Sequence, residues 1–178
     1  MTMKLFQGDC VSILKDMPDN SVDSIVTDPP YGLSAQKRED IEQCLFSWSQ
    51  HKKYEHGKKG FKGNAWDGWV PDPETWRECY RVLKHGGHIA AFASPRTSDL
   101  MSIAMRLAGF ECRDVAMWVF GSGVPKGNNI AIALEKEMKK IGISDDEIAA
   151  KLSIYDDNHI LLKPAYEPIL IFRKPLDG

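Results

Sequence analysis

Short apolar stretches alternate along this chain with stretches whose apolar residues recur every three or four positions, and this alternation constrains the fold most. The strands that it predicts are residues 22–27, 88–93, 115–120 and 167–172, with a shorter one at 4–7. The helices that it predicts begin at Pro73, at Ser98, at Asn128 or Asn129, and at a capping box headed by Ser144. Repeated strand–helix units with apolar strands predict an α/β fold, in which helices cover both faces of a mostly parallel sheet.

The size and composition of the chain are typical of one globular domain spanning residues 1–178. No apolar run approaches the roughly 20 residues that cross a bilayer, and the N-terminal sequence MTMKLFQGDC lacks the apolar core of a secretory signal. The 4 cysteines form no CxxC pair, which argues against a metal site and favours reduced thiols. We therefore expect a cytoplasmic protein that binds no metal and no membrane.

The predicted strand at 22–27 ends in an unusual way, with Asp28, Pro29, Pro30, Tyr31 and Gly32. Ligands of open α/β sheets bind outside the carboxyl ends of the strands. Two consecutive prolines stiffen the backbone there, so the Asp28 carboxylate and the Pro29 carbonyl form a rigid pair of acceptors that suits an NH₂ group. The Tyr31 ring can stack on a planar ligand. The pattern predicts a pocket for adenine or cytosine, flipped out of a duplex. A simple strand-ending turn with an Asp cap is the alternative.

Further stretches carry a resemblance to a known family: residues 7–10, 17–23, 27–32, 64–67, 81–87, 118–126 and 163–168. Together with the Asp-Pro-Pro-Tyr motif, they resemble the S-adenosylmethionine-dependent DNA amino-methyltransferases over nearly the whole chain. The resemblance is to the circularly permuted beta class, in which the catalytic motif precedes the cofactor motif. It implies a Rossmann-like methyltransferase sheet, S-adenosylmethionine as the cofactor and DNA as the partner.

The same resemblance assigns catalysis to Asp28, Pro29, Pro30 and Tyr31. In this family an Asp at the first motif position usually accompanies transfer to adenine N6, whereas Ser accompanies cytosine N4. We therefore expect methylation of the N6 of a flipped adenine. N4-cytosine methylation and a non-catalytic DNA-binding or regulatory remnant remain alternatives. Methylation of a protein glutamine is less favoured, because related enzymes carry Asn before the prolines.

The family's second half, with a glycine-rich loop around the methionine part of the cofactor, has no counterpart in this sequence. The stretch Phe120-Gly121-Ser122-Gly123 differs from that loop in its spacing. The resemblance thus implies a catalytic half whose sheet lacks the central cofactor-binding strands, and a second polypeptide or second copy that completes it. Asp28 and Asp9 are the candidate cofactor contacts, although Asp9 serves equally well as the cap of a helix at Val11.

A long basic loop without evident periodicity is expected at residues 33–65. Because the net charge is -2, a case for DNA rests on a local patch. The basic segment, residues 51–63 (HKKYEHGKKGFKG), supplies one, with Tyr54 and Phe61 interleaved as candidate base-stacking residues. The expected DNA contacts are Lys52, Lys53, Lys58, Lys59, Lys62, Arg96 and Lys126. Residues 143–163 occupy the place of a short target-recognition insert in the family.

Overall fold

A computed structural model describes residues 3–58, 60, 63, 66–121, 130–155 and 165–177 of the chain. The chain divides into two compact units, the first formed by Met1–Trp118 with Glu167–Gly178 and the second by Val119–Tyr166. The sequence predicts one domain with an insert at 143–163, and this insert lies wholly in the second unit. Residues 156–163 of it are outside the described part.

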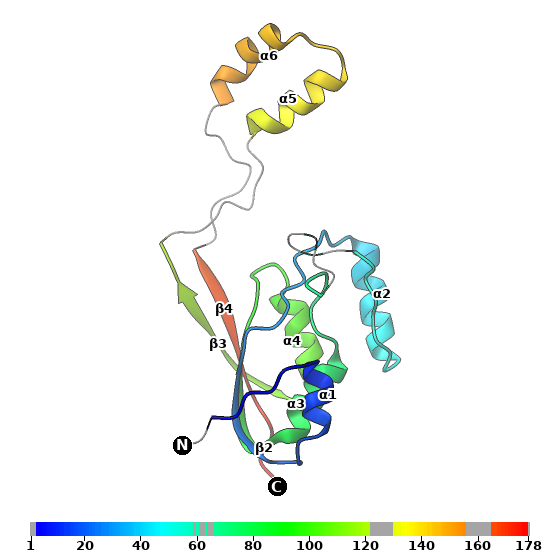
Figure 1. Ribbon diagram of the computed structural model, residues 1–178, viewed down its shortest axis with the longest axis vertical. Coiled ribbons are helices and arrows are strands. Elements are labelled where there is room, and N and C mark those ends of the chain that lie inside the picture. Colours follow the sequence, from blue (N-terminus) through cyan, green and yellow to red (C-terminus); the bar gives the residue numbers. More distant parts are fainter. Residues whose placement is uncertain are drawn as a thin grey trace. The chain divides into compact units, whose positions relative to one another are not determined.

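The first unit is built on a sheet with the strand order β1-β2-β4-β3 (Figure 1). The strands are β1 (Val22–Thr27), β2 (Leu83–Phe92), β3 (Glu111–Val119) and β4 (Tyr166–Arg173). β1 pairs in parallel with β2, with Thr27 opposite Ala91. β4 pairs antiparallel with β2, with Ile169 opposite Phe92. The first residues of β4 therefore lie at the carboxyl ends of β1 and β2.

The α/β class is confirmed, and so is the parallel pairing of the first two strands. The antiparallel course of β4 was not predicted, because an apolar strand pattern carries no information on direction. In the described part of the chain, β1 lies at an edge of the sheet and pairs only with β2.

Helices lie on one side of this sheet, and the core is between the two layers (Figure 1). They are α1 (Cys10–Lys15), α2 (Arg38–Ser49), α3 (Pro73–Val82) and α4 (Ser98–Leu107). Trp76 of α3, Met101 of α4 and Phe172 of β4 are among the fully buried residues. Along β4, burial alternates from residue to residue, which is typical of a sheet with one covered face.

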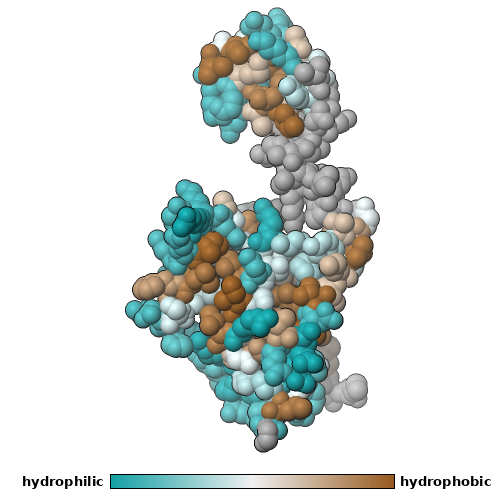
Figure 2. Space-filling view, turned by 180° about the vertical axis from the view of Figure 1, so that it is seen from behind, coloured by the Kyte–Doolittle hydropathy of each residue, from teal (hydrophilic) through white to brown (hydrophobic). Residues whose placement is uncertain are grey.

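The prediction that helices cover both faces is therefore wrong for the described residues. Val26 of β1 is 76% exposed. Apolar patches also interrupt the hydrophilic surface of this unit (Figure 2).

Two local predictions need correction. No strand forms at residues 4–7, where Leu5 and Phe6 are exposed and have no neighbouring strand to supply hydrogen bonds. The helix from Pro73 ends at Val82 rather than at the glycines, and β2 begins at once. The pairing of β1 shifts from Val22 opposite Leu83 to Ser24 opposite His88, so the glycine pair lies in a bulge of β2.

The second unit contains α5 (Ile130–Lys140), α6 (Asp145–Leu152) and a 3₁₀ turn at Ser153–Tyr155. The predicted cap of α6 is confirmed, because the Ser144 side chain accepts a hydrogen bond from the Glu147 backbone. None of the helices that the structure describes is both long enough and apolar enough to cross a membrane.

Candidate active site

Asp28, Pro29 and Pro30 lie where the parallel pair β1–β2 ends, as the sequence predicts. Asp28 directly follows the last residue of β1 and is exposed, whereas the two prolines are half-buried. All three line a largely apolar cavity of about 550 Å³ between β1, α1 and α3. An ionisable carboxylate at the rim of an apolar cavity, on a backbone stiffened by two prolines, suits a polar group on an otherwise flat and apolar ligand.

The backbone of Tyr31 is fixed from both sides by buried side chains. Its N–H donates to Oδ1 of Asp67 at 3.0 Å, and its carbonyl accepts from Oγ1 of Thr97 at 2.6 Å. Asp67 is 6% exposed and Thr97 1% exposed. Because neither bond competes with water, together they allow the loop little freedom to move.

The Tyr31 hydroxyl is fixed by a third side chain, as it donates to Oε2 of Glu167 at 3.3 Å. Glu167 precedes the buried Pro168 in β4. Burial, together with the Asp28 and Glu167 carboxylates near the hydroxyl, raises the pKa of Tyr31 well above its ordinary value. The phenol therefore stays neutral and remains a hydrogen-bond donor. We call Asp67, Thr97 and Glu167 the Tyr31 clamp.

Gly32 allows the loop after Tyr31 to lie directly on the segment at 67–70. Its φ is +66°, and a Cβ there would lie 2.8 Å from the Val70 nitrogen. The next residues continue this contact, since the Leu33 N–H donates to the Asp67 carbonyl at 3.1 Å and Ser34 Oγ donates to the Gly68 carbonyl at 2.7 Å. The Gly in the motif thus places Asp67 next to the Tyr31 backbone.

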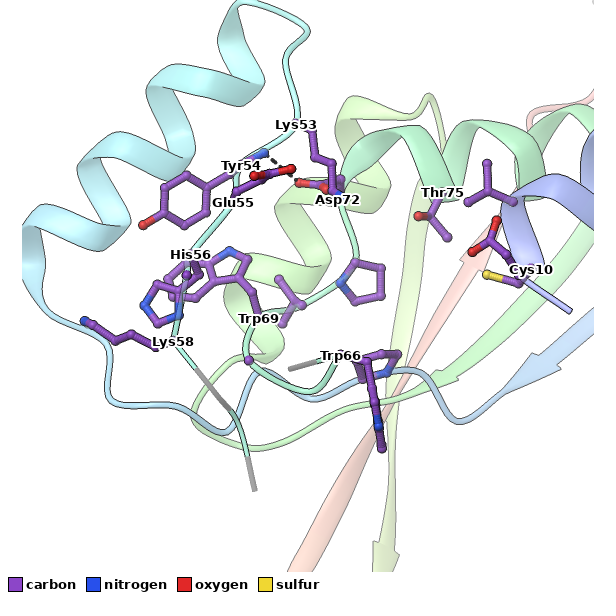
Figure 3. A pocket seen from close by; sticks show the side chains of 17 residues that line it. Cys10, Lys53, Tyr54, Glu55, His56, Lys58, Trp66, Trp69, Asp72 and Thr75 are labelled. Atoms are coloured by element: carbon purple, nitrogen blue, oxygen red, sulfur yellow. Dashed lines mark hydrogen bonds between the residues drawn. The ribbon is translucent and has the colours of Figure 1, made fainter. Parts of the chain in front are cut away.

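A second cavity, of about 570 Å³, shares Pro30 with the first as a lining residue, and Figure 3 shows the side chains around it. Residues at the start of α1, in the basic segment, and at 66–72 line it. Trp69 and His56 lie together in its wall, with ring centroids 4.4 Å apart, whereas Trp66 stands apart from them. Trp66 is 68% exposed, so its indole is available to a ligand.

Asp9 lines the same cavity and also caps α1. Its Oδ1 accepts hydrogen bonds from the Ser12 backbone N–H and from Ser12 Oγ, both at 2.9 Å. The backbone hydrogen bond, followed by the hydroxyl, holds the pKa of Asp9 below its ordinary value. The capping role is thus confirmed, and the carboxylate keeps a negative charge at the edge of the cavity.

The basic segment follows a helix that was not predicted, α2, within the expected loop at 33–65. Asp72 holds both the helix and the basic segment. Its Oδ1 accepts a hydrogen bond from Nε1 of Trp48 in α2 at 2.8 Å and another from the Tyr54 backbone N–H at 3.2 Å. Burial raises the pKa of Asp72. The Tyr54 ring packs edge-on against Trp69, with centroids 5.1 Å apart. Tyr54 therefore contributes to the packing of this segment, and its role in base stacking stays a prediction.

The predicted DNA-contacting residues differ in their surroundings. Lys52, Lys53 and Arg96 are exposed, and Lys53 lines the 570 Å³ cavity. Lys58 pairs with Asp40 at 2.7 Å, and its hydrogen bond is the main cause that lowers the pKa of Asp40 to about 2. Lys59, Lys62, Lys126 and the aromatic Phe61 lie outside the described residues.

Sequence reasoning missed the residues around the motif: the Tyr31 clamp and the exposed Trp66. Trp66, Asp67 and Glu167 are part of stretches that carry the family resemblance, so a signal existed for them. Thr97 lies outside these stretches. Within the described residues, no group of three or more His, Cys, Asp or Glu side chains is arranged to hold a metal ion.

Comparison with known proteins gives a consistent result. A family model described as DNA methylase (N6_N4_Mtase) matches residues 22–177. Type II methyltransferase M.HindIII of Haemophilus influenzae is 24% identical over 189 residues, covering 96% of this chain and 58% of that protein. M.BamHI of Bacillus amyloliquefaciens is 31% identical over 100 residues, covering 56% of this chain and 19% of that protein.

Among solved structures, PvuII DNA methyltransferase, described as cytosine-N4-specific, matches with a TM-score of 0.49 at 16% identity. The match covers 94% of this chain and 47% of that one. The chain spans less than two thirds of the length of each of these three proteins.

Proposed function

The chain belongs to the DNA methylase family, and from this premise we propose that it transfers a methyl group from S-adenosylmethionine to the exocyclic N6 of an adenine flipped out of duplex DNA. The observation that carries the proposal is the loop after β1. It offers a stiff pair of acceptors at Asp28 and Pro29, followed by an aromatic residue whose backbone and hydroxyl are both fixed.

The two acceptors match the two N–H bonds of an aromatic amine. An amine nitrogen on a purine or pyrimidine is a poor nucleophile, because its lone pair is delocalised into the ring. When the Asp28 carboxylate and the Pro29 carbonyl accept hydrogen bonds from the two N–H groups, electron density moves onto the amine nitrogen. The Asp28 charge then stabilises the positive charge that builds there during transfer.

Tyr31 supplies the face on which the base lies. A flipped base loses its stacking partners in the duplex, and an aromatic ring in the pocket replaces them. Because the Tyr31 clamp fixes this ring relative to Asp28, the base is held with its amino group at the acceptors. Positioning of this kind accounts for a large part of the rate acceleration in a reaction between two bound molecules.

S-adenosylmethionine, when bound, supplies an electrophilic methyl group on a sulfonium. The described residues fit part of this cofactor. Asp28 borders the 550 Å³ cavity, and Asp9 places an anionic acceptor for hydroxyl or amino groups at the 570 Å³ cavity. Two cavities that share Pro30 as a lining residue suit a reaction in which two ligands meet. Ser122 and Gly123 of the Phe-Gly-Ser-Gly stretch are outside the described residues.

The proposal includes two partners. DNA phosphates would meet the exposed Lys52, Lys53 and Arg96 of the first unit. A second polypeptide would supply the glycine-rich cofactor loop beside the edge strand β1, or a second copy of this chain would complete the cofactor half with the residues that it has.

Adenine is preferred to cytosine because the motif begins with Asp28 rather than Ser. N4-cytosine methylation stays the alternative, since the acceptor pair suits either amino group.

The proposal is tested by the variant Asp28→Ala, with Asp23→Ala as the matched control on the same strand. Asp23 is exposed and pairs with Lys84 at 2.6 Å, away from the motif. We expect Asp28→Ala to lower transfer of labelled methyl groups to DNA by at least about 1,000-fold, with an unchanged circular dichroism spectrum. Asp23→Ala should retain activity. Equal activity of both variants would show that Asp28 does not receive the target amine.

A further inference from the structure

The antiparallel course of β4 brings Glu167 to the active-site loop. The next residue, Pro168, accepts a hydrogen bond from the Ala93 N–H at the end of β2, at 2.9 Å. Because β2 runs parallel to β1 and Thr27 lies opposite Ala91, the end of β2 lies beside Asp28. Glu167 is therefore carried by sheet pairing, which places a side chain more accurately than a free loop does.

The Tyr31 hydroxyl has one proton and two carboxylates close to it. Oε2 of Glu167 lies 3.3 Å from the hydroxyl oxygen of Tyr31. The Asp28 carboxylate is also close to this hydroxyl, and its hydrogen bonding and charge help to raise the pKa of Tyr31. One proton makes a strong hydrogen bond to one acceptor at a time. Whichever carboxylate accepts it, the other keeps its lone pairs for a different donor.

We propose that Glu167 is a positioning residue: its carboxylate takes the hydrogen bond of the Tyr31 hydroxyl and so leaves the Asp28 carboxylate free for the amino group of the target base. The inference rests on the proposed function, because it needs Asp28 to receive that amino group. It adds a role for a residue 139 positions away from Asp28 in the sequence (167 - 28 = 139).

The surroundings of Glu167 agree with this role. Tyr31 and Glu167 are both half-buried, so their hydrogen bond is only partly exposed to competition from water. In the part of the chain that the structure describes, no lysine or arginine forms an ion pair with Glu167. A partly buried carboxyl group needs a hydrogen-bond partner, and the Tyr31 hydroxyl supplies one.

The experiment compares Glu167→Ala, Glu167→Gln, Tyr31→Phe and the double variant Tyr31→Phe/Glu167→Ala in the full-length protein. Single-turnover methyl transfer is measured at saturating S-adenosylmethionine and duplex DNA, and the Kd for DNA is measured separately. We expect Glu167→Ala to slow transfer roughly 10- to 100-fold while the Kd stays within about twofold, because the hydroxyl then donates to Asp28. Glu167→Gln keeps an acceptor and should recover most of the rate.

The double variant distinguishes a positioning role of Glu167 from a structural one. Without the Tyr31 hydroxyl, only the amino group of the base donates to the Asp28 carboxylate, so Tyr31→Phe/Glu167→Ala should transfer methyl groups faster than Glu167→Ala alone. A merely structural Glu167 predicts the opposite, a double variant at least as slow as Glu167→Ala. That result, or a wild-type rate in Glu167→Ala, would overturn the inference.

Crystal structures of the wild type and Glu167→Ala separate this inference from the proposed function. If the wild type transfers no methyl group to DNA, the proposed function fails, and the structures still test the hydrogen bond. We expect the Tyr31 hydroxyl to turn to the Asp28 carboxylate in Glu167→Ala. A hydroxyl that stays in its wild-type position, without contacting Asp28, would contradict the role of Glu167.

Discussion

The loop after β1 and the basic segment belong to the same unit, yet they are held in opposite ways. In the loop, the side chains of the Tyr31 clamp bind the backbone and the hydroxyl of Tyr31. In the basic segment, Tyr54 and His56 pack inward against Trp69, while Lys52 and Lys53 remain in solvent.

Under the proposed function, this difference corresponds to two physical tasks. Transfer of a methyl group requires atoms to be placed to within a fraction of an ångström, so the residues concerned are fixed directly. A contact with DNA phosphates depends mainly on charge and reach, and a long lysine side chain supplies both without a fixed geometry. We therefore expect small changes around the loop to lower the transfer rate, and loss of lysine charge in the basic segment to weaken DNA binding.

The largest effect in this comparison is expected from the Tyr31 clamp. Thr97→Val removes the hydroxyl that donates to the Tyr31 carbonyl at 2.6 Å and leaves that carbonyl without its partner. We expect the free energy of unfolding to fall by about 1–3 kcal/mol and the rate of methyl transfer to fall by roughly 10- to 100-fold. Urea unfolding and a transfer assay measure the two effects.

Ser102→Ala, which removes a half-buried hydroxyl in the nearby helix α4, is the control for Thr97→Val. If Thr97→Val lowered stability as expected but left the transfer rate unchanged, the fixed position of Tyr31 would not matter for the reaction.

A smaller effect is expected from the basic segment. Changing Lys52 and Lys53 together to alanine should weaken DNA binding and lower the slope of log Kd against log salt by about 0.9 for each phosphate that is no longer neutralised. Transfer at saturating DNA should be nearly unchanged. Lys15→Ala with Lys84→Ala, two exposed lysines elsewhere in the unit, should leave the slope as it is. An unaltered slope in the Lys52/Lys53 variant would remove the basic segment from the DNA interface.

The smallest effect concerns Asp40 and its partner Lys58. The pKa of Asp40 is lowered from 3.8 to about 2 in the folded protein, so its carboxylate stabilises the fold above about pH 4 and loses this contribution as the pH falls toward 2. The wild type should therefore be more stable than Asp40→Asn at pH 7, with a gap that narrows below about pH 4. Urea unfolding of both proteins measures this difference in stability. A range of about pH 3 to 7 includes the ordinary pKa of an aspartate. A gap that widened on acidification would contradict the assignment.

The elements that carry strong local patterns could be predicted from the sequence. Pro73 begins α3, Ser144 caps α6, and Asp28 directly follows the strand β1. Each of these depends on residues close in the sequence. The helix α2 could also have been found, since Ile41, Cys44, Leu45 and Trp48 follow the i, i+3, i+4, i+7 spacing of a helix and two of them, Cys44 and Trp48, are buried.

The rest of the site depends on contacts between distant segments. Thr97 reaches Tyr31 because β2 ends beside β1, and Glu167 reaches it because β4 runs antiparallel to β2. The direction and order of strands decide both contacts, and neither is encoded in a local pattern. The packing of Tyr54 against Trp69 could not be predicted for a similar reason, because only the fold brings these two residues together.

The most direct test of the central claim is the identity of the methylated product. The protein is incubated with duplex DNA and labelled S-adenosylmethionine, the DNA is digested, and the labelled nucleosides are separated against standards. The account predicts N6-methyladenine, and its loss in Asp28→Ala. Labelled N4-methylcytosine would keep the amine-accepting site but contradict the choice of adenine. Label in neither nucleoside, from a protein shown to bind S-adenosylmethionine and DNA, would contradict the methyl-transfer function and favour a protein that only binds DNA.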